Sequence, residues 1–482
     1  MSLCLTKQQP LRYNRTATTD AALHEPRSSS GPGHRPFKAE ITGSNPVRGT
    51  FILLNCHAQR SEASPCQVQS KRILMISVEE ALERILAEIT PLSATRMPLP
   101  DSLGHVLTED VISQEDIPPF ANSAMDGFAL LSQDSQPRDG QPPRLRVTGG
   151  VAAGYIADHA VEPGSAMRIM TGAPVPPGAD TVIQVELTRS DGPESEWVEI
   201  MQEIAPGNNI RPAGEDMRRG QTVLLRGTEI GPWEIGILAT LGWTHVPVIR
   251  RPRVAILGTG DEVIDVHEPL RPGKIRNSNS YLLEAAVRKA GAEPQRLGVA
   301  RDTVESLREK FSEAIQCDLI ITSGGVSVGE FDLVKNIMTE QGEIHFWRIN
   351  MRPGKPVAFG HIGAVPLLGL PGNPVSAAVT FELFGRPVIR KMLGHTHLLH
   401  PQADVAVEDG VSERVMRRHY VRAHVEWRDG RLIAHTTGNQ GSNIMTSLLN
   451  ANALLIVPEG GTVIQPGGTA KAIMLDWPEV KS

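Results

Sequence analysis

Two glycine-containing loops carry side chains suited to binding phosphate. Residues 322–329 read TSGGVSVG and follow an apolar, strand-like run, and residues 370–374 read LPGNP after another such run. Paired glycines let backbone N–H groups approach phosphate oxygens, and Ser323 and Ser327 add hydroxyl donors. A tight turn after a strand has a similar composition, so the first loop alone leaves both interpretations open.

The second loop also begins a helix. Asn373 stands at the N-cap position and Pro374 at the first helical position, an arrangement that favours a helix start whether or not a ligand binds. A helix N-terminus attracts anions through its free N–H groups and its dipole. The same residues can therefore serve both helix initiation and anion binding.

Three cations surround a rigid turn. Arg348, Arg352 and Lys355 flank Pro353 and Gly354. Several cations on such a turn hold a tetrahedral oxyanion more firmly than one flexible lysine. A solvated basic loop is the alternative, and the residues alone do not decide between the two.

Carboxylates follow several of the predicted strands. Asp261 and Glu262 belong to the segment GTGDE, Asp302 follows the next strand, and Asp332 ends the segment GEFD. Carboxylates beside a phosphate-binding loop suggest Mg²⁺, which would bridge them to a substrate phosphate. Surface carboxylates at strand ends are also common in proteins without metal.

Alternating helices and strands must position these loops. From residue 252 to 396, apolar strand-like runs such as 254–257 and 318–322 alternate with helical stripes such as 281–289. This alternation is typical of an α/β domain, in which ligands bind at the carboxyl ends of the strands. We expect one continuous helix over residues 374–393.

The flanking segments predict other kinds of structure. Residues 75–119 and 214–250 each contain one helical segment, and we expect the helix at 231–242 to pack on the helix that follows Ser77. Short β segments separated by Gly and Pro fill residues 120–213, and strand-like alternation returns over residues 397–482. We predict a small inserted β domain and a C-terminal barrel or sandwich.

Composition narrows the classes of function. The chain has 482 residues, 40% hydrophobic and 21% charged, which is typical of a multidomain soluble protein. The net charge of -6 gives no broad basic field, so no nucleic-acid partner is expected. No apolar run approaches the roughly 18 residues of a membrane helix. Four cysteines without CxxC spacing fit a reducing cytoplasm.

Residues 1–74 differ from the rest of the chain. Basic residues outnumber acidic ones, Ser, Pro and Gly are abundant, and no apolar period lasts, which predicts a disordered extension. A transit peptide is the alternative, although the prolines would break its amphipathic helix. Met75 directly precedes a capping box. Our hypothesis is that the folded protein begins there and that residues 1–74 come from an upstream start codon.

Six motifs occur together in one order. They are SAMDGFA (123–129), MTGAPVP (170–176), GTGDE (258–262), TSGGVSVGEFD (322–332), RPGKP (352–356) and GLPGNPVS (369–376). In this order they resemble the molybdopterin molybdenumtransferase family, and the resemblance runs from about residue 75 to residue 476. It implies a multidomain α/β plus β fold with a helical dimerisation domain (75–119 and 214–250), an inserted β domain (120–213), a molybdopterin-binding α/β domain (252–396) and a C-terminal β barrel (397–482).

The resemblance also implies a reaction. Members of the family take adenylylated molybdopterin and molybdate, cleave the pyrophosphate link with Mg²⁺, and yield molybdenum cofactor and AMP. The catalytic residues would be Asp126, Asp216, Asp302, Asp332 and Glu262, of which Asp302, Asp332 and Glu262 would bind Mg²⁺. Residues binding adenylylated molybdopterin would be Thr171, Asp261, Ser323, Gly324, Gly325, Ser327, Asn373 and Ser376. Residues holding molybdate would be Arg348, Arg352, Lys355, Pro356, Ser376, Arg417 and Ser442.

The expected assembly is an elongated homodimer in which Asp126 and Asp216 act across the interface. Expected protein partners are the molybdopterin adenylyltransferase and the molybdoenzymes that accept the cofactor.

Two other functions remain open. Molybdopterin adenylyltransferases share a similar α/β domain but lack the flanking domains, and proteins of this architecture also cluster membrane receptors in animals. The intact polar motifs favour catalysis. Some relatives carry Lys where this chain has Arg348 and Arg352, so the geometry around an oxyanion would differ.

Overall fold

The computed structural model describes residues 75–325 and 344–479. The prediction of disorder for residues 1–74 therefore lies outside the described residues, and so do Ser327 and Asp332. Within the described ranges, no helix is long and apolar enough to cross a membrane.

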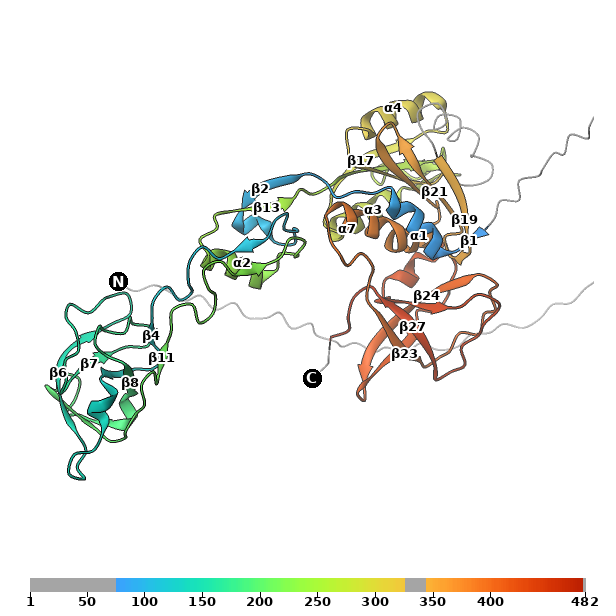
Figure 1. Ribbon diagram of the computed structural model, residues 1–482. Helices are drawn as coiled ribbons and strands as arrows, with labels where there is room; N and C mark the ends of the chain where they lie inside the picture. Colours follow the sequence, from blue (N-terminus) through green and yellow to red (C-terminus); the bar gives the residue numbers. More distant parts are fainter. Residues whose placement is uncertain (1–74, 326–343, 480–482) are drawn as a thin grey trace, which may run out of the picture. The chain divides into compact units, whose positions relative to one another are not determined.

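A sheet that includes β1, β17, β19 and β21 forms the centre of the α/β domain (Figure 1). It has seven strands in the order β1-β19-β21-β22-β18-β14-β17. Strands β17, β14, β18 and β22 are parallel neighbours, whereas β21 runs antiparallel to β22 and β19. The bounds are β1 (Met75–Ile76), β14 (Arg253–Thr259), β17 (Glu293–Ala300), β18 (Leu319–Ser323), β19 (Ile344–Ile349), β21 (Pro356–Ile362) and β22 (Val365–Leu370).

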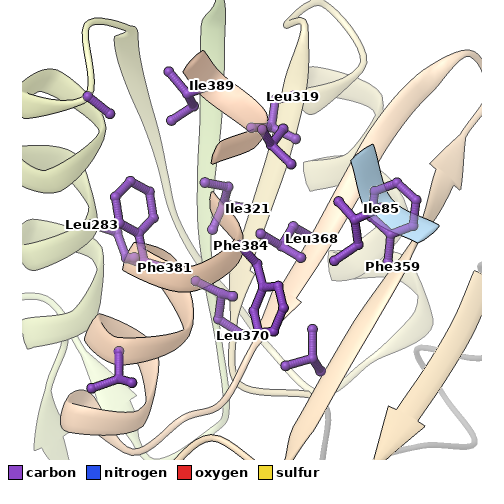
Figure 2. Close-up of a cluster of buried hydrophobic side chains, with 14 of the residues drawn as sticks. Ile85, Leu283, Leu319, Ile321, Phe359, Leu368, Leu370, Phe381, Phe384 and Ile389 are labelled. Carbon is purple, nitrogen blue, oxygen red and sulfur yellow. The ribbon is translucent and has the colours of Figure 1, made fainter. Parts of the chain in front are cut away.

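Helices cover both faces of this sheet because successive strand side chains point to opposite sides. Ile256 and Ile321 pack in one cluster with side chains of α1, α3, α6 and α7, part of which Figure 2 shows. Ala255 and Ile320, one residue earlier on the same strands, pack against Phe311 of α4. The helices are α1 (Val78–Ala87), α3 (Ser278–Lys289), α4 (Val304–Ala314), α6 (Pro374–Thr380) and α7 (Arg386–Met392). The predicted α/β architecture is confirmed.

The helix expected over residues 374–393 is not a single α-helix. Five residues, Phe381–Gly385, form a π-helical segment, η4, between α6 and α7. A π segment inserts one extra residue into a helix, and periodicity over a short window does not detect this. The side chains before and after η4 are therefore offset from their positions on a regular α-helix.

The inserted β domain contains a six-stranded sheet in the order β8-β5-β7-β6-β10-β9. Its core includes Phe128, Ile183 and Val198. The elements are β4 (Asn122–Ser123), β5 (Gly127–Leu130), η2 (Ser132–Ser135), β6 (Arg144–Val151), β7 (Ser165–Ile169), β8 (Thr181–Gln184), η3 (Val185–Leu187), β9 (Thr188–Arg189), β10 (Trp197–Ile200) and β11 (Ile210–Arg211).

The expectation that the helix at 231–242 packs on the first helix is wrong. Leu238 of α2 packs with Val246 and Val248. Ile85 of α1 instead belongs to the core of the seven-stranded sheet, which β1 also joins beside β19. The elements around α2 (Pro232–Thr240) are β2 (Ala94–Pro98), η1 (Leu99–Ser102), β3 (Val111–Ile112), β12 (Thr222–Leu224) and β13 (His245–Ile249).

The C-terminal strands form a closed barrel. Their order is β20-β24-β25-β23-β27-β26, and β24 also pairs with β26, which closes the strands from β24 to β26 into a ring. This closure decides between the barrel and the sandwich. The elements are β20 (Met351–Arg352), β23 (Gln402–Val407), β24 (Arg418–Arg428), β25 (Arg431–Thr436), η5 (Met445–Leu448), β26 (Ala453–Val457) and β27 (Gly468–Met474).

Candidate functional site

Three parallel strands end side by side and open into a cleft. Gly258 on β14 is level with Ser323 on β18, and Ser323 is level with Leu370 on β22. A cleft of about 630 Å³ lies at these carboxyl ends. The expected site residues that line it are Glu262, Ser323, Gly324, Gly325, Pro356, Asn373 and Ser376. An open α/β sheet places ligands at this edge.

The loop after β18 is held tightly at Gly324. Its backbone N–H donates to Leu370 O at 3.1 Å, and its φ of 97° lies in the left-handed region. A Cβ atom added there would stand 2.6 Å from Thr259 Oγ1, closer than van der Waals contact allows. Only glycine therefore lets the loop pass against the end of β14 while Ser323 stays beside the cleft.

Asn279 joins two loops of the cleft, and sequence reasoning missed it. Its Nδ2 donates to Ser323 Oγ at 2.8 Å and to Gly372 O at 2.7 Å. It lies in the first turn of α3, where Asn277 Oδ1 accepts from Ser280 N and caps the helix. The sequence did contain a signal, because residues 277–280 read NSNS and Asn and Ser are favoured at helix starts. The N-terminus of this helix lies at the cleft.

Asn373 occupies the N-cap position of α6, but its side chain does not cap the helix. Its Nδ2 instead donates to Ser442 Oγ at 3.2 Å, and Val375 N donates to Ser442 O at 3.2 Å. The expected capping hydrogen bond is therefore replaced by a contact with the barrel. This contact brings Ser442 close to Ser376, and Asn443, which sequence reasoning missed, lines the cleft.

Carboxylates gather where β14 and β17 end. Asp261 N donates to Asp302 Oδ2 and Asp302 N donates to Asp261 Oδ1, both at 3.3 Å. Partial burial raises the pKa of Asp302, and the negative charges of Asp261 and Glu262 raise it further. The two aspartates expected near the substrate thus lie together, beside Glu262 at the cleft wall.

The residue types at this corner fit Mg²⁺. Among the described residues, no three His, Cys, Asp or Glu side chains are arranged to hold a metal ion. The oxygen donors are those that Mg²⁺ prefers, and a cation would relieve the repulsion that raises the pKa of Asp302. Asp332, the third expected ligand, lies outside the described ranges.

The cations expected to hold molybdate do not line the cleft in this structure. They are Arg348, Arg352, Lys355 and Arg417. Arg352 forms a short ion pair with Glu413, and Arg417 Nη1 donates to Met351 O at 3.2 Å. Among the described residues, the one cation that does line the cleft is Arg276, which sequence reasoning missed. Across residues 75–325 and 344–479, no hydrogen bond or ion pair engages its guanidinium.

Arg422, on the barrel strand β24, is a second cation that sequence reasoning missed. It is fully buried; Nε donates to Ser447 Oγ at 3.1 Å and Nη2 to Gly441 O at 3.2 Å. Its Nη1 has no partner among the described residues. Burial and the nearby charge of Arg352 lower the pKa of Arg422 to about 10. The sequence signal was an arginine between the apolar residues of a strand. Charged side chains are seldom fully buried unless they are paired.

The remaining expected residues lie in other parts of the chain. Asp126 accepts from Thr171 N at 2.6 Å and from Thr171 Oγ1 at 2.7 Å, and these hydrogen bonds lower the pKa of Asp126. Asp216 is exposed, and its backbone N donates to Ile117 O at 3.0 Å. The structure therefore brings Asp126 and Thr171 together, and neither they nor Asp216 line the cleft of the same chain.

Comparisons with known proteins cover nearly the whole described chain. Three family models match: the MoeA N-terminal region (domain I and II) over residues 76–242, the probable molybdopterin binding domain over 255–391, and the MoeA C-terminal region (domain IV) over 405–475. A molybdopterin molybdenumtransferase of Bacillus subtilis is 36% identical over 415 residues, covering 84% of this chain and 96% of that protein.

Two further relatives agree. Molybdopterin molybdenumtransferase 2 of Mycobacterium tuberculosis is 38% identical over 404 residues, covering 82% of this chain and 98% of that protein. Among solved structures, a molybdopterin biosynthesis MoeA protein from Pyrococcus horikosii superposes with a TM-score of 0.73 at 29% identity, covering 84% of this chain and all of that one.

Proposed function

Because this chain belongs to the molybdopterin molybdenumtransferase family and is a transferase of molybdenum cofactor synthesis, we propose the complete reaction that it catalyses. The substrates are adenylylated molybdopterin and molybdate, and the products are molybdenum cofactor and AMP. The observation that carries the proposal is the cleft at the carboxyl ends of β14, β18 and β22. It combines a glycine loop with two helix N-termini, and Glu262 in its wall is followed by the Asp261–Asp302 pair.

The phosphate groups of the substrate lie against the loop after β18. Ser323, Gly324 and Gly325 line the cleft there, and Asn279 fixes the Ser323 hydroxyl. The N-termini of α3 and α6 face the same space, so their N–H groups and dipoles stabilise anionic oxygens. Arg276 supplies a full positive charge, which pairs with the pyrophosphate. This set binds the substrate and orients its P–O–P link.

The carboxylates act on the same link. When bound by Glu262, Asp302 and Asp332, Mg²⁺ would offset the negative charge that develops on the phosphate oxygens as AMP departs. Asp261 positions Asp302 through the reciprocal backbone hydrogen bonds. Asp302 is kept close to two like charges, so the ionised carboxylate gains more from a cation than an isolated aspartate would.

Molybdate is held on the barrel side of the cleft. Ser376 and Pro356 line the cleft and Ser442 touches the start of α6. We assign the charge to Arg348, Arg352, Lys355 and Arg417, and add Arg422, which is fully buried near Arg352 and contributes positive potential without direct contact. Arg352 would exchange Glu413 for the substrate, and its planar guanidinium can hold two oxygens at once.

The site is completed across a homodimer. Asp126, hydrogen-bonded to Thr171, and Asp216 lie in the segments that the family model assigns to domains I and II. Neither lines the cleft of its own chain. In the proposed dimer they approach the cleft of the second subunit, while the molybdopterin adenylyltransferase supplies the substrate and a cofactor-free molybdoenzyme accepts the product.

The test is an incubation of the purified chain with adenylylated molybdopterin, Mg²⁺ and molybdate. We expect AMP release that requires both ions, together with activation of a cofactor-free molybdoenzyme. AMP release without molybdate would contradict coupled insertion. Substrate binding without any turnover would make this chain a binding scaffold instead of an enzyme.

A further inference from the structure

A second cavity lies apart from the cleft, beside the π-helical segment η4. Its volume is about 240 Å³, and it shares no lining residue with the cleft. Side chains of α3, of η4 and α7, and of the segments before β23 and after β27 surround it. None of the residues that line this cavity has a role in the proposed reaction.

Four of the charged or titratable side chains around this cavity are paired with one another. His400 Nε2 lies 2.8 Å from Glu382 Oε2, and both side chains are largely buried. Lys289 Nζ lies 2.8 Å from Asp476 Oδ2 at the more exposed rim. Lys289 and Asp476 offset each other's charge, and Glu382 is hydrogen-bonded to His400, so neither pair leaves a cation free for a ligand.

Arg386, at the junction of η4 and α7, is not paired in this way. One of its N–H groups donates to Leu398 O at 3.0 Å, and no carboxylate among residues 75–325 and 344–479 pairs with its guanidinium. Burial lowers the pKa of Arg386 and the neighbouring Arg390 lowers it further, whereas the charges of Glu382 and Glu229 partly offset this lowering. A half-buried guanidinium without a carboxylate partner retains donors that face the cavity.

Apolar groups form the rest of the wall. Phe381 and Ala290 are buried, and Ala286 and Leu475 are half-buried beside them. The Phe381 ring lies so close to Gly385 that a Cβ atom there would stand 2.6 Å from it, so the π turn holds this ring in place. Among the described residues that line the cavity, Arg386 is the one cation without an ion pair. Beside this apolar wall it suits a ligand with a single negative charge and a compact hydrocarbon body.

We propose that this cavity is a second ligand site that binds a small organic carboxylate, whose charge pairs with Arg386 and whose apolar body packs against Phe381 and Ala286. The site is independent of the proposed function. Its occupant contacts the continuous helix α6–η4–α7, whose first turn lines the substrate cleft. Pi segments frequently occur at functional sites, which is consistent with this placement.

The experiment measures binding of 4-fluorobenzoate and of its neutral isostere 4-fluorobenzamide to the full chain by ligand-observed ¹⁹F NMR. We expect the benzoate to bind about tenfold more tightly than the benzamide, since a charge-assisted hydrogen bond contributes about that factor. Arg386→Gln should weaken benzoate about tenfold and leave the benzamide nearly unchanged. Ala286→Phe, which fills the cavity without altering charge, should weaken both ligands.

Arg288→Gln is the matched control, because Arg288 is exposed on α3 and pairs with Glu284 outside the cavity. It should change neither affinity. Arg386→Lys, which keeps the charge, tests the site if Arg386→Gln melts at a lower temperature. Equal binding of benzoate and benzamide would overturn the proposal, as would an equal loss in Arg288→Gln, or displacement of benzoate by AMP or molybdate, which would place it in the cleft.

Discussion

Arg276 is the single cation among the described residues that line the cleft, and no described residue engages its guanidinium. In the proposed reaction it pairs with a pyrophosphate. Arg276→Gln should therefore lower kcat/KM for adenylylated molybdopterin about 10- to 100-fold, the range for losing one charge-assisted hydrogen bond. Arg253→Gln, at the opposite end of β14, is the control, and AMP release is the measurement. Equal effects in both variants would point to a general loss of charge or stability.

The ionisation of Asp302 affects the free energy of unfolding of the protein. Burial and two like charges raise its pKa above the ordinary 3.8. Such a group favours the folded state at low pH, and this contribution is lost as the pH rises through the raised pKa. Relative to Asp302→Asn, the wild type should therefore lose unfolding free energy as the pH rises from below 3.8 towards neutrality. Urea denaturation at a series of pH values measures it, and parallel curves for the two proteins would refute it.

Magnesium should raise the stability of the wild type relative to Asp302→Asn, opposite to the effect of raising the pH. A cation bound only to the folded state raises the free energy of unfolding in proportion to the logarithm of its concentration. At neutral pH, Mg²⁺ should raise the melting temperature of the wild type more than that of Asp302→Asn. An equal rise in both would remove Asp302 from the proposed ligand set.

Among the elements, the loop after β18 depends most strictly on one residue. Gly324→Ala would place a methyl group 2.6 Å from Thr259 Oγ1 at a φ of 97°. We expect AMP release to fall at least about tenfold, because the clash with Thr259, added to backbone strain of about 1–3 kcal/mol, is relieved only by moving the loop. Gly363→Ala is the matched control. Its φ of 58° is also positive, but an added Cβ meets nothing within 4 Å. Similar losses in both variants would attribute the effect to backbone strain alone.

The sequence predicted the elements best where one physical signal dominated. The continuous apolar runs of β14 and β18 predicted strands buried on both faces, and Ser77 caps α1 by accepting a 3.0 Å hydrogen bond from Glu80 N. The loop at Ser323 and the start of α6 both lie at the cleft as expected. The family and the α/β plus β architecture followed from motif order.

The parts that the sequence missed depend on contacts between distant segments. Asn279 joins two loops only after β18 and β22 pair, and Asn373 leaves its capping role because Ser442 of the barrel reaches it. Arg422 stands out because burial removes it from water, which composition does not reveal. The π segment at Phe381–Gly385 has no local signature in the apolar period.

For the whole molecule, the decisive prediction concerns cross-subunit sites. Asp126→Ala and Asp302→Asn chains should each be inactive as homodimers. In a mixed dimer, one of the two sites pairs the intact Asp302 of one chain with the intact Asp126 of the other, so random mixing should restore roughly a quarter of wild-type activity. Coexpression with two purification tags and an AMP assay measures this. No recovery in the isolated mixed dimer would place both residues in a site built by one chain.

The pairing of β1 with β19 sets a constraint on synthesis in the cell. Met75 and Ile76 are level with Arg348 and Ile349, so the first described strand of the chain joins a neighbour made far later. At roughly 5–20 residues per second, the ribosome needs on the order of tens of seconds to bridge that interval. Until then β19, η4 and α7, which α1 contacts in the folded protein, do not yet exist, and the apolar face of α1 with Ile85 stays uncovered. Nascent chains that stall before residue 344 should therefore be clients for chaperones that hold unfolded segments.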